Sequence, residues 1–290
     1  MNVIIITPAR NEGVFLEGTI ECMRNQTVLP KQWIIVNDGS NDGTEAIVKK
    51  YVDELPFITY ITLEDRGFRL PGSGVVDAFY SGFSCIKHNY DIISKLDADV
   101  QFPKNMIEII IKAFKENHKL GITGPIQYEK MNNEGEYKRV YCPRGYVAGP
   151  HKFYRKECFE DINGLIRRAG WDGVDIIKAK IKGWETGEID NLILFHLKST
   201  GTAKGEGTKK ACLKYGDVSY YMGGYFWYFL LRVIYRTVEQ KNIKVGYYMI
   251  QGFLRSMHEK SEREPMEFRK YLKYIQRENT INWFRDIYPK

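Results

Sequence analysis

Short apolar runs alternate with amphipathic segments along the first hundred residues. Four runs rich in Val, Ile and other apolar residues predict buried strands: 2–7, 33–38, 57–64 and 91–99. Three segments with apolar residues at helical spacing follow the first three strands: 13–26, 45–55 and 75–88. Strands that alternate with such helices predict an α/β fold with a doubly wound, mostly parallel sheet flanked by helices.

The pattern becomes less regular after residue 100. The predicted elements are, in order, a helix (104–117), a strand (121–129), a hairpin tip (132–138), a strand or turn that enters a short helix (149–165), a helix that stops at Gly183 (172–184) and a strand (185–198). Residues 201–207 (GTAKGEG) are Gly-rich and suit a mobile lid or a linker, and the rest of the chain is predicted to be helical.

Polar clusters follow three of the predicted strands. They read TPARNE (7–12), NDGSNDGT (37–44) and DADVQFP (97–103). In an open parallel sheet, ligands bind outside the carboxyl ends of the strands. Three acidic and polar clusters at one edge therefore predict a ligand site there.

Composition excludes several classes of protein. Five cysteines without a C-x-x-C pair argue against a disulfide framework or a zinc knuckle and fit a reducing cytosol. The N-terminus has no basic segment before its short apolar run, so we read it as a first strand and not as a signal peptide. The expected location is the cytoplasm, with contact to the inner face of the cell membrane left open.

The net charge of +7 is concentrated near the C-terminus. Residues 198–290 hold 18 Lys and Arg against 9 Asp and Glu, whereas residues 1–197 hold 25 against 27. Such a basic surface suits anionic lipid or phosphate-bearing substrates, or is simply a set of solvated helix faces. Nucleic-acid binding is not expected, because no recognised module accompanies the charge.

Five motifs, in order, resemble those of the family 2 glycosyltransferases: TPARNE, VNDGSNDGT, LDAD, YRKECFEDINGL and GWDGVD. The resemblance covers residues 2–200 and implies a GT-A (Rossmann-like) fold. It also implies an inverting enzyme that moves a sugar from a nucleotide-diphosphate sugar, first of all a UDP-sugar, to a hydroxyl of a glycan or lipid-linked acceptor. The segment RGFRLPGSGVVDAFYSG departs from the Arg-Asn-x-Gly pattern usual in the family.

This resemblance divides the chain into three parts. Residues 1–100 would form the nucleotide-binding half of the GT-A domain, and residues 101–200 its acceptor and catalytic half. Residues 201–290 would add the Gly-rich loop and an aromatic, basic helical extension.

The D-x-D pair Asp97 and Asp99 is the candidate metal site. A divalent cation neutralises a departing diphosphate, and Mg²⁺ or Mn²⁺ prefers oxygen ligands. By resemblance Asp99 is the direct ligand, while Asp97 acts on the metal or on the donor ribose, and His196 completes the shell. The alternatives are an N-cap role for Asp99 and a core role for His196.

The resemblance assigns the nucleotide to the carboxyl ends of the first three strands. Asp38 would hold the base or ribose, although Asp-Gly sequences are also ordinary turn chemistry. Glu12 either lines the nucleotide or pairs with Arg10. The full set of expected nucleotide contacts is Pro8, Arg10, Glu12, Asp38, Arg66, Arg69 and Asp97.

Asp172 in GWDGVD is the candidate catalytic base, with Asp175 as the alternative and an N-cap role as the structural explanation. A carboxylate near the anomeric carbon can take the proton of the acceptor hydroxyl as it attacks. Five further residues are expected near the donor sugar or the acceptor: Gly149, His151, Trp171, Lys198 and Lys204.

Two other readings of the function remain open. A nucleotidyltransferase would need a Gly-rich basic signature near the first strand, which TPARNE does not supply. A non-catalytic nucleotide-sugar or membrane-surface binding protein would not need Asp172. Whatever the function, residues 218–245, dense in aromatic residues and Arg, are expected to pack in the core, contact a membrane or form a homodimer.

Overall fold

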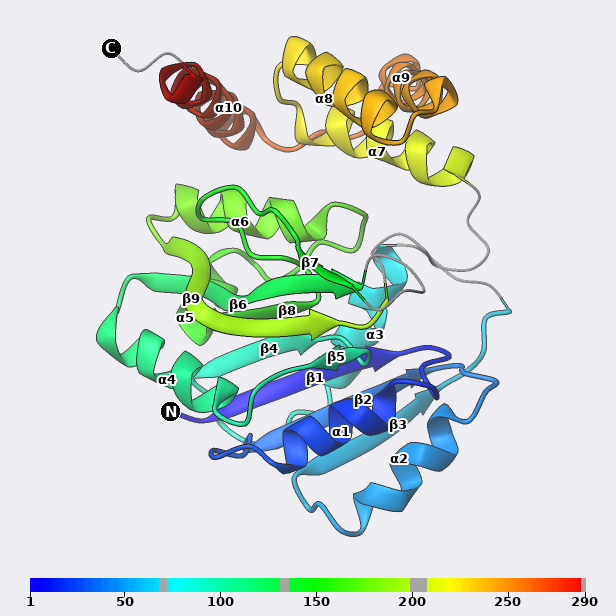
Figure 1. Cartoon of the computed structure of the whole chain (residues 1–290), viewed down its shortest axis with the longest axis vertical. Coiled ribbons are helices and arrows are strands. Elements are labelled where there is room, and N and C mark those ends of the chain that lie inside the picture. The colour runs from blue at the N-terminus through cyan, green and yellow to red at the C-terminus, as the bar shows by residue number, and fades with distance from the viewer. Residues whose placement is uncertain (68–71, 131–135, 199–207, 288–290) are drawn as a thin grey trace. The chain divides into compact units, whose positions relative to one another are not determined.

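The computed structural model describes residues 1–67, 72–130, 136–198 and 208–287. The chain divides into two compact units, Met1–Thr200 and Gly201–Lys290 (Figure 1). Three expected features lie outside the described residues, namely Arg69, Lys204 and the Gly-rich segment 201–207.

The first unit is a mixed sheet with helices on both faces (Figure 1). Its strands are β1 (Val3–Ala9), β2 (Gln32–Asp38), β3 (Ile58–Leu63), β4 (Ile92–Leu96), β5 (Val100–Gln101), β6 (Leu120–Lys130), β7 (Tyr137–Arg139), β8 (His151–Arg155) and β9 (Glu185–His196). Its helices are α1 (Leu16–Arg24), α2 (Thr44–Val52), α3 (Ser73–Phe83), α4 (Met106–Glu116), α5 (Lys156–Asp161) and α6 (Trp171–Ile181).

The strand order is β3-β2-β1-β4-β8-β6-β9-β5, with β7 paired to β6. The first four strands in this order run parallel, as predicted from their alternation with helices. The second half is mixed, because β8 runs antiparallel to both β4 and β6 while β9 runs parallel to β6. The β6–β7 pair flanks residues 131–135, where a hairpin tip was predicted and which lie outside the described part of the chain.

The strands of the parallel half are buried on both faces, which explains their continuous apolar runs. Alternate residues of β1 pack on opposite sides of the sheet: Ile5 joins the cluster under α1, α2 and α4, whereas Ile4 and Ile6 join the cluster under α3, α5 and α6. Gly82 lets α3 approach closely, since a Cβ built there would lie 2.7 Å from Ile6 Cγ2. The carboxyl ends of the strands are thus held by a rigid core.

The second unit consists of helices α7 (Thr208–Met222), α8 (Phe226–Glu239), α9 (Ile243–His258) and α10 (Met266–Ile287). Glycines bring α7 and α9 into backbone contact: a Cβ built on Gly252 would lie 2.0 Å from the carbonyl oxygen of Leu213. Phe229 and Val233 of α8 pack against this pair in a small apolar cluster. Among the described residues, no helix is long and apolar enough to cross a membrane.

Candidate active site

The D-x-D residues lie on a bend between β4 and β5, and this bend is fixed on three sides. The amide of Asp97 donates to the carbonyl of Pro150 (2.8 Å), and the carbonyl of Asp99 accepts from the amide of Leu197 (2.9 Å). The hydroxyl of Thr19 in α1 donates to the carbonyl of Ala98 (2.8 Å). The backbone is therefore held before any ligand arrives. Asn105 precedes α4, so Asp99 does not cap that helix.

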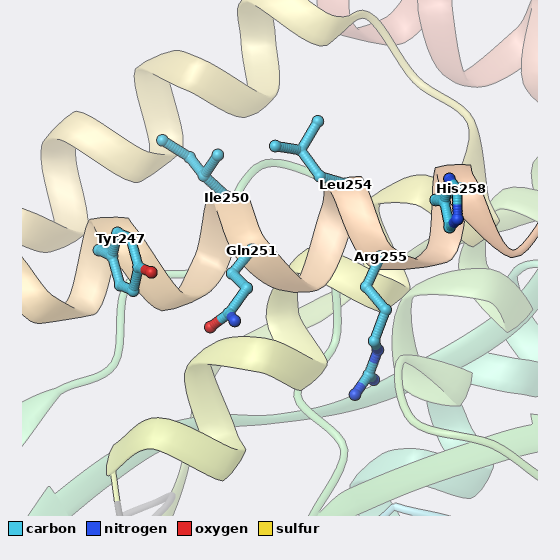
Figure 2. Close-up of a pocket in the computed structure, with 6 residues that line it drawn as sticks. All are labelled: Tyr247, Ile250, Gln251, Leu254, Arg255 and His258. Atoms are coloured by element: carbon cyan, nitrogen blue, oxygen red, sulfur yellow. The ribbon is translucent and has the colours of Figure 1, made fainter.

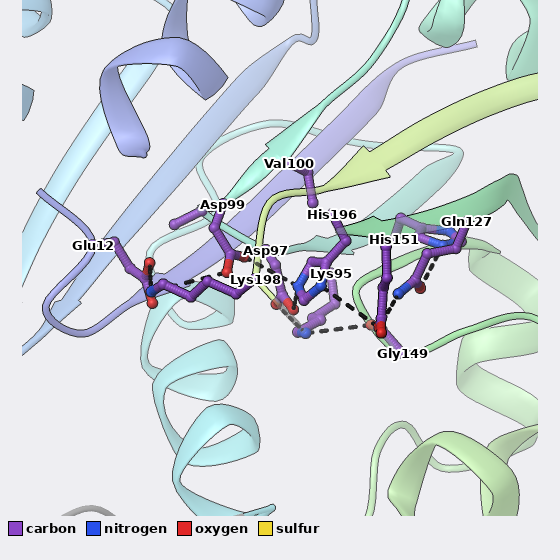
Figure 3. Close-up of polar contacts among 12 residues, drawn as sticks. Glu12, Lys95, Asp97, Asp99, Val100, Gln127, Gly149, His151, His196 and Lys198 are labelled. Carbon is purple, nitrogen blue, oxygen red and sulfur yellow. Dashed lines mark hydrogen bonds and ion pairs between the residues drawn. The ribbon is translucent and has the colours of Figure 1, made fainter. Parts of the chain in front are cut away.

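Asp97, Asp99 and His196 converge at this bend (Figure 3). Each offers one ligand atom, and the three atoms lie within 4.8 Å of one another. His196 Nε2 is 3.3 Å from Asp99 Oδ1 and 3.9 Å from Asp97 Oδ2. The antiparallel pairing of Val100 with His196 places the imidazole beside the aspartates, although almost a hundred residues separate them in the sequence.

The charges of this cluster are strongly coupled. Burial would raise the pKa of Asp99, but the imidazole of His196 and the ammonium of Lys198 hold that pKa below its ordinary value. Burial would lower the pKa of His196, but Asp99 and Asp97 outweigh it and raise that pKa. The two carboxylates therefore favour positive charge at this bend, on the imidazole or on a bound cation.

Two carboxylates and an imidazole form a suitable donor set for a divalent cation such as Mn²⁺. Within the described part of the chain, the buried Nδ1 of His196 has no hydrogen-bond partner, and it lies 3.7 Å from Glu129 Oε1. A carboxylate on this side of the ring can orient an imidazole that ligates through Nε2. The residues present thus fit a bound cation.

Glu12 lies next to this cluster and not next to Arg10. Its carboxylate forms an ion pair with Lys198, whose Nζ is also 3.9 Å from Asp99 Oδ2. Burial and the charge of Asp99 raise the pKa of Glu12 to about 7, against the attraction of Lys198. The pairing of Glu12 with Arg10, one of the two alternatives drawn from the sequence, is absent here.

The end of β2 forms a second polar group around Asp38. Arg66 Nη2 lies 2.6 Å from Asp38 Oδ2, and Arg10 donates to the Asp38 carbonyl and, at 2.6 Å, to Asp65 Oδ1. Gly39 has a φ of +68°, and a Cβ there would lie 2.5 Å from the Cα of Asp65, so only glycine allows this approach.

Asp38 retains an unused acceptor. Its Oδ1 is buried and has no hydrogen-bond partner among the residues that the structure describes, while burial raises the pKa of Asp38 in spite of Arg66 and Arg10. A buried acceptor without a donor is costly, and a donor from a ligand would remove that cost. Pro8 is half-buried and lies in the same part of the sheet, because it pairs with Val36 of β2, two residues before Asp38.

Asp172 lies in the first turn of α6. The residue that caps α6 is Gly170, with a φ of 82°, so Asp172 is not the N-cap. Tyr146 donates a hydrogen bond to Asp172 Oδ2 (3.0 Å). A Cβ built on Gly149 would lie 3.3 Å from the same oxygen, which places the Gly149 backbone directly beside the carboxylate.

Lys152 and Asp175 form a buried ion pair under the start of α6. Lys152 Nζ lies 2.8 Å from both carboxylate oxygens of Asp175 and also donates to the Asp172 carbonyl. The hydroxyl of Tyr154 donates to Asp175 Oδ2 at 2.6 Å. Asp175 is 1% exposed and enclosed by these partners, which favours its structural role over its role as the base.

Lys95 connects the two halves of the site. Its side chain is 4% exposed, and its ammonium forms an ion pair with Asp97 and donates to the Gly149 carbonyl at 3.3 Å (Figure 3). It also lies 5.4 Å from the ring centre of Trp171, which is buried in the core. Sequence reasoning missed Lys95, although a lysine within the apolar strand IISKL was a visible signal.

His151 belongs to the core and not to an open surface. It is fully buried, its Nε2 is 3.2 Å from Gln127 Oε1, and burial lowers its pKa to about 3. The ring is thus neutral and covered in this structure. Its neighbour Gly149, at the turn before β8, is the residue of this loop that lies beside Asp172.

Comparison with known proteins identifies the family of this chain. The family model described as glycosyl transferase family 2 matches residues 4–169, more than half of the chain. The chain belongs to glycosyl transferase family 2. The match covers all the strands that carry the D-x-D bend and Asp38, but it ends before α6, so Asp172 and His196 lie beyond it.

The relatives of this family 2 chain are longer proteins. This chain is 27% identical over 130 residues to the chondroitin synthase of Pasteurella multocida. The match spans 44% of this chain but only 13% of that synthase. Two solved structures are similar in fold. The structure of S. aureus TarS 1–349 in complex with UDP-GlcNAc matches with a TM-score of 0.56 at 16% identity. The match covers 74% of this chain and 65% of the TarS chain.

The second structure is the mannosyltransferase PcManGT from Pyrobaculum calidifontis, solved with GDP-Man and Mn²⁺. It matches with a TM-score of 0.54 at 13% identity, and the match covers 93% of this chain and 68% of the PcManGT chain. At these identities the likeness shows the fold alone, and it confirms the predicted GT-A fold of this family 2 chain.

Proposed function

We propose that this chain is a metal-dependent inverting glycosyltransferase that uses a nucleotide-diphosphate sugar. The observation that carries the proposal is the convergence of Asp97, Asp99 and His196 within 4.8 Å on a fixed bend. A cation held by such a group can neutralise the charge of a diphosphate as it leaves. A nucleotide at Asp38 and a base at Asp172 would complete the machinery on the same sheet edge.

Asp99, Asp97 and His196 would hold Mn²⁺ or Mg²⁺, which supplies positive charge to a departing diphosphate. Asp38 would accept a hydrogen bond from the base through its unpaired Oδ1, and a uracil N3–H is a matching donor. Arg10, Arg66 and Lys198 would contribute cationic charge around the ribose and phosphates. Lys198 would exchange Glu12 for the diphosphate as the donor binds.

In the proposed reaction the acceptor hydroxyl attacks the anomeric carbon from the side opposite the diphosphate. Asp172 takes the hydroxyl proton as the new carbon–oxygen bond forms. The bond from the anomeric carbon to the phosphate oxygen breaks, and its electron pair leaves with the nucleoside diphosphate. Tyr146 orients the Asp172 carboxylate through its hydrogen bond, and the configuration at the anomeric carbon inverts.

The names of similar proteins support the reaction class and leave the substrates open. TarS was solved with UDP-GlcNAc and PcManGT with GDP-Man and Mn²⁺. We propose a UDP-sugar as donor and a glycan or lipid-linked hydroxyl as acceptor. The matched relative is a synthase of which this chain spans a small part, so these substrates are proposals for this chain.

Thermal stability in the presence of nucleotides tests the proposal. A ligand that binds only the folded state stabilises it by about 2.7 kcal/mol at a hundred times its Kd. We expect UDP with Mn²⁺ to raise the melting temperature more than GDP with Mn²⁺, and more than UDP with EDTA. Asp99→Asn should remove the metal-dependent part, whereas Asp53→Asn, at the exposed end of α2, should not. No shift with any nucleoside diphosphate, with or without metal, would contradict the proposal.

A further inference from the structure

The C-terminal unit carries an apolar stripe that faces solvent. Trp227, Leu231, Ile234, Tyr235 and Val238 of α8 are all exposed, at positions i, i+4, i+7, i+8 and i+11. This spacing places them on one side of the helix. Phe229 and Val233 occupy the opposite side and pack in the core of the unit. The exposed stripe therefore has no packing role within that core.

Helix α9 adds a second row of exposed apolar residues: Ile243, Tyr247, Leu254 and Met257. A shallow groove of about 430 Å³ runs along the same helix, where Arg255 and His258 stand beside Ile250 and Leu254 (Figure 2). None of the predicted catalytic or nucleotide-binding residues lines it. Apolar surface gathered in this way marks an interaction site more often than scattered exposed residues do.

The charge around these rows is one-sided. Residues 225–258 contain one acidic residue, Glu239, and five Lys and Arg residues. The five cations are Arg232, Arg236, Lys241, Lys244 and Arg255. Arg232 lies on the flank of the α8 stripe, and Lys241 and Lys244 lie at the α8–α9 connection. A surface that is both apolar and cationic is complementary to anionic lipid headgroups above acyl chains.

We infer that helices α8 and α9 bind an anionic lipid surface, with α8 lying in the plane of the interface. An α-helix of 14 residues is about 21 Å long, shorter than a bilayer core. Trp227, Tyr235 and Tyr247 carry rings with an apolar body and a polar edge, which suit the headgroup level. The glycine contacts between α7 and α9 keep the platform beneath the stripe rigid.

A second copy of the chain fits this surface less well. A twofold symmetric contact places the same patch on both partners. Arg232, Lys241 and Lys244 of one copy would then approach the same cations of the other, and segment 225–258 contains a single acidic residue, Glu239, to offset them. Like charges brought together in this way oppose association.

Vesicle co-flotation of the full chain tests the inference without donor, acceptor or metal, so its outcome is independent of the proposed reaction. We expect binding to phosphatidylcholine vesicles that contain phosphatidylglycerol, weaker binding to phosphatidylcholine alone, and loss of binding at high salt. The double variant Leu231→Ser/Ile234→Ser should bind at least roughly tenfold more weakly. Leu29→Ser is the matched control, because Leu29 is 49% exposed and Leu231 is 52% exposed.

The charge contribution has its own pair of variants. Lys244→Gln should weaken binding to anionic vesicles roughly fivefold. Lys112→Gln, on the exposed face of α4, should leave binding unchanged. Melting curves of each variant verify that it folds.

Three results would overturn the inference. The first is the absence of binding to anionic vesicles, and the second is equal binding by the stripe variant and its control. The third is a concentration-dependent dimer, measured by light scattering, that Leu231→Ser/Ile234→Ser abolishes while vesicles bind neither protein. That third result would assign the stripe to a second copy of the chain.

Discussion

The two units of this chain place charged and apolar side chains in opposite ways. The N-terminal unit buries charged groups, among them Glu12, Asp38, Lys95 and Asp99 near the ends of its strands and Asp175 in helix α6. The C-terminal unit exposes apolar side chains instead, with 13 of the 19 exposed large hydrophobic residues among the described positions. Burying a charge and exposing an apolar ring are both unfavourable for an isolated domain. Each unit thus has its unfavourably placed side chains, buried charges in one and exposed apolar groups in the other, where we propose that it binds a ligand.

Replacing the proposed base should have the largest effect and should be confined to the chemistry. Asp172→Asn keeps an acceptor for Tyr146 but cannot take a proton, so transfer should fall by about 10²- to 10⁴-fold. Donor affinity, measured calorimetrically, and vesicle binding should stay unchanged. Asp53→Asn is the control.

The base assignment can fail in two distinct ways. Unchanged turnover by Asp172→Asn would remove the catalytic role altogether. Loss of donor affinity together with turnover would move Asp172 to the donor side of the site.

Breaking the buried ion pair should have the next largest effect. Lys152→Met leaves the Asp175 carboxylate buried without its counter-ion and should cost about 3–5 kcal/mol of unfolding free energy. Lys112→Met, whose side chain is 72% exposed, should change it by less than about 0.5 kcal/mol. Urea titration measures both.

A double variant keeps this prediction decisive if Lys152→Met does not fold. Lys152→Met/Asp175→Leu removes both charges and should regain most of the lost free energy. If Lys152→Met lowered the free energy of unfolding no more than Lys112→Met does, the ion pair would not stabilise α6.

Glycine-to-alanine substitutions should have opposite effects on stability in the two units, because the packing around the glycines differs. Gly252→Ala drives a methyl group into the Leu213 carbonyl and should destabilise the C-terminal unit by about 1–3 kcal/mol. Gly18→Ala, in α1, meets only Gln101 Nε2 at 3.6 Å and should stabilise its helix by about 0.5–1 kcal/mol. Hydrogen exchange measures each helix directly, and equal protection of α9 in the wild type and Gly252→Ala would contradict the close contact.

The smallest effect concerns pH. The pKa of Glu12 is raised from 4.5 to about 7, so the folded state binds more protons than the unfolded state between these values. Stability in EDTA should therefore fall as pH rises through this window. Glu12→Gln should remove this fall and be more stable than the wild type by about 1–2 kcal/mol at pH 8. Parallel pH profiles of the two proteins would contradict the shifted pKa.

The sequence sufficed to predict the strands and the polar clusters at their ends, because these depend on local pattern. It also sufficed to bring His196 to Asp97 and Asp99 through the resemblance, a convergence that the structure contains. The supporting contacts could not be predicted. Lys95 and Lys152 stand opposite each other only because β8 pairs antiparallel with β4 in one register, and no local pattern specifies that register.

The position of β9 has a consequence for how the molecule is made. It is the last strand of the sheet in sequence, yet it lies between β6 and β5. During synthesis the edge of β6 must therefore wait unpaired until residue 196 has emerged, and the loop that closes is long. Asp97, Asp99 and His196 come together at that closure, so a chain interrupted before β9 would present its two aspartates without their histidine.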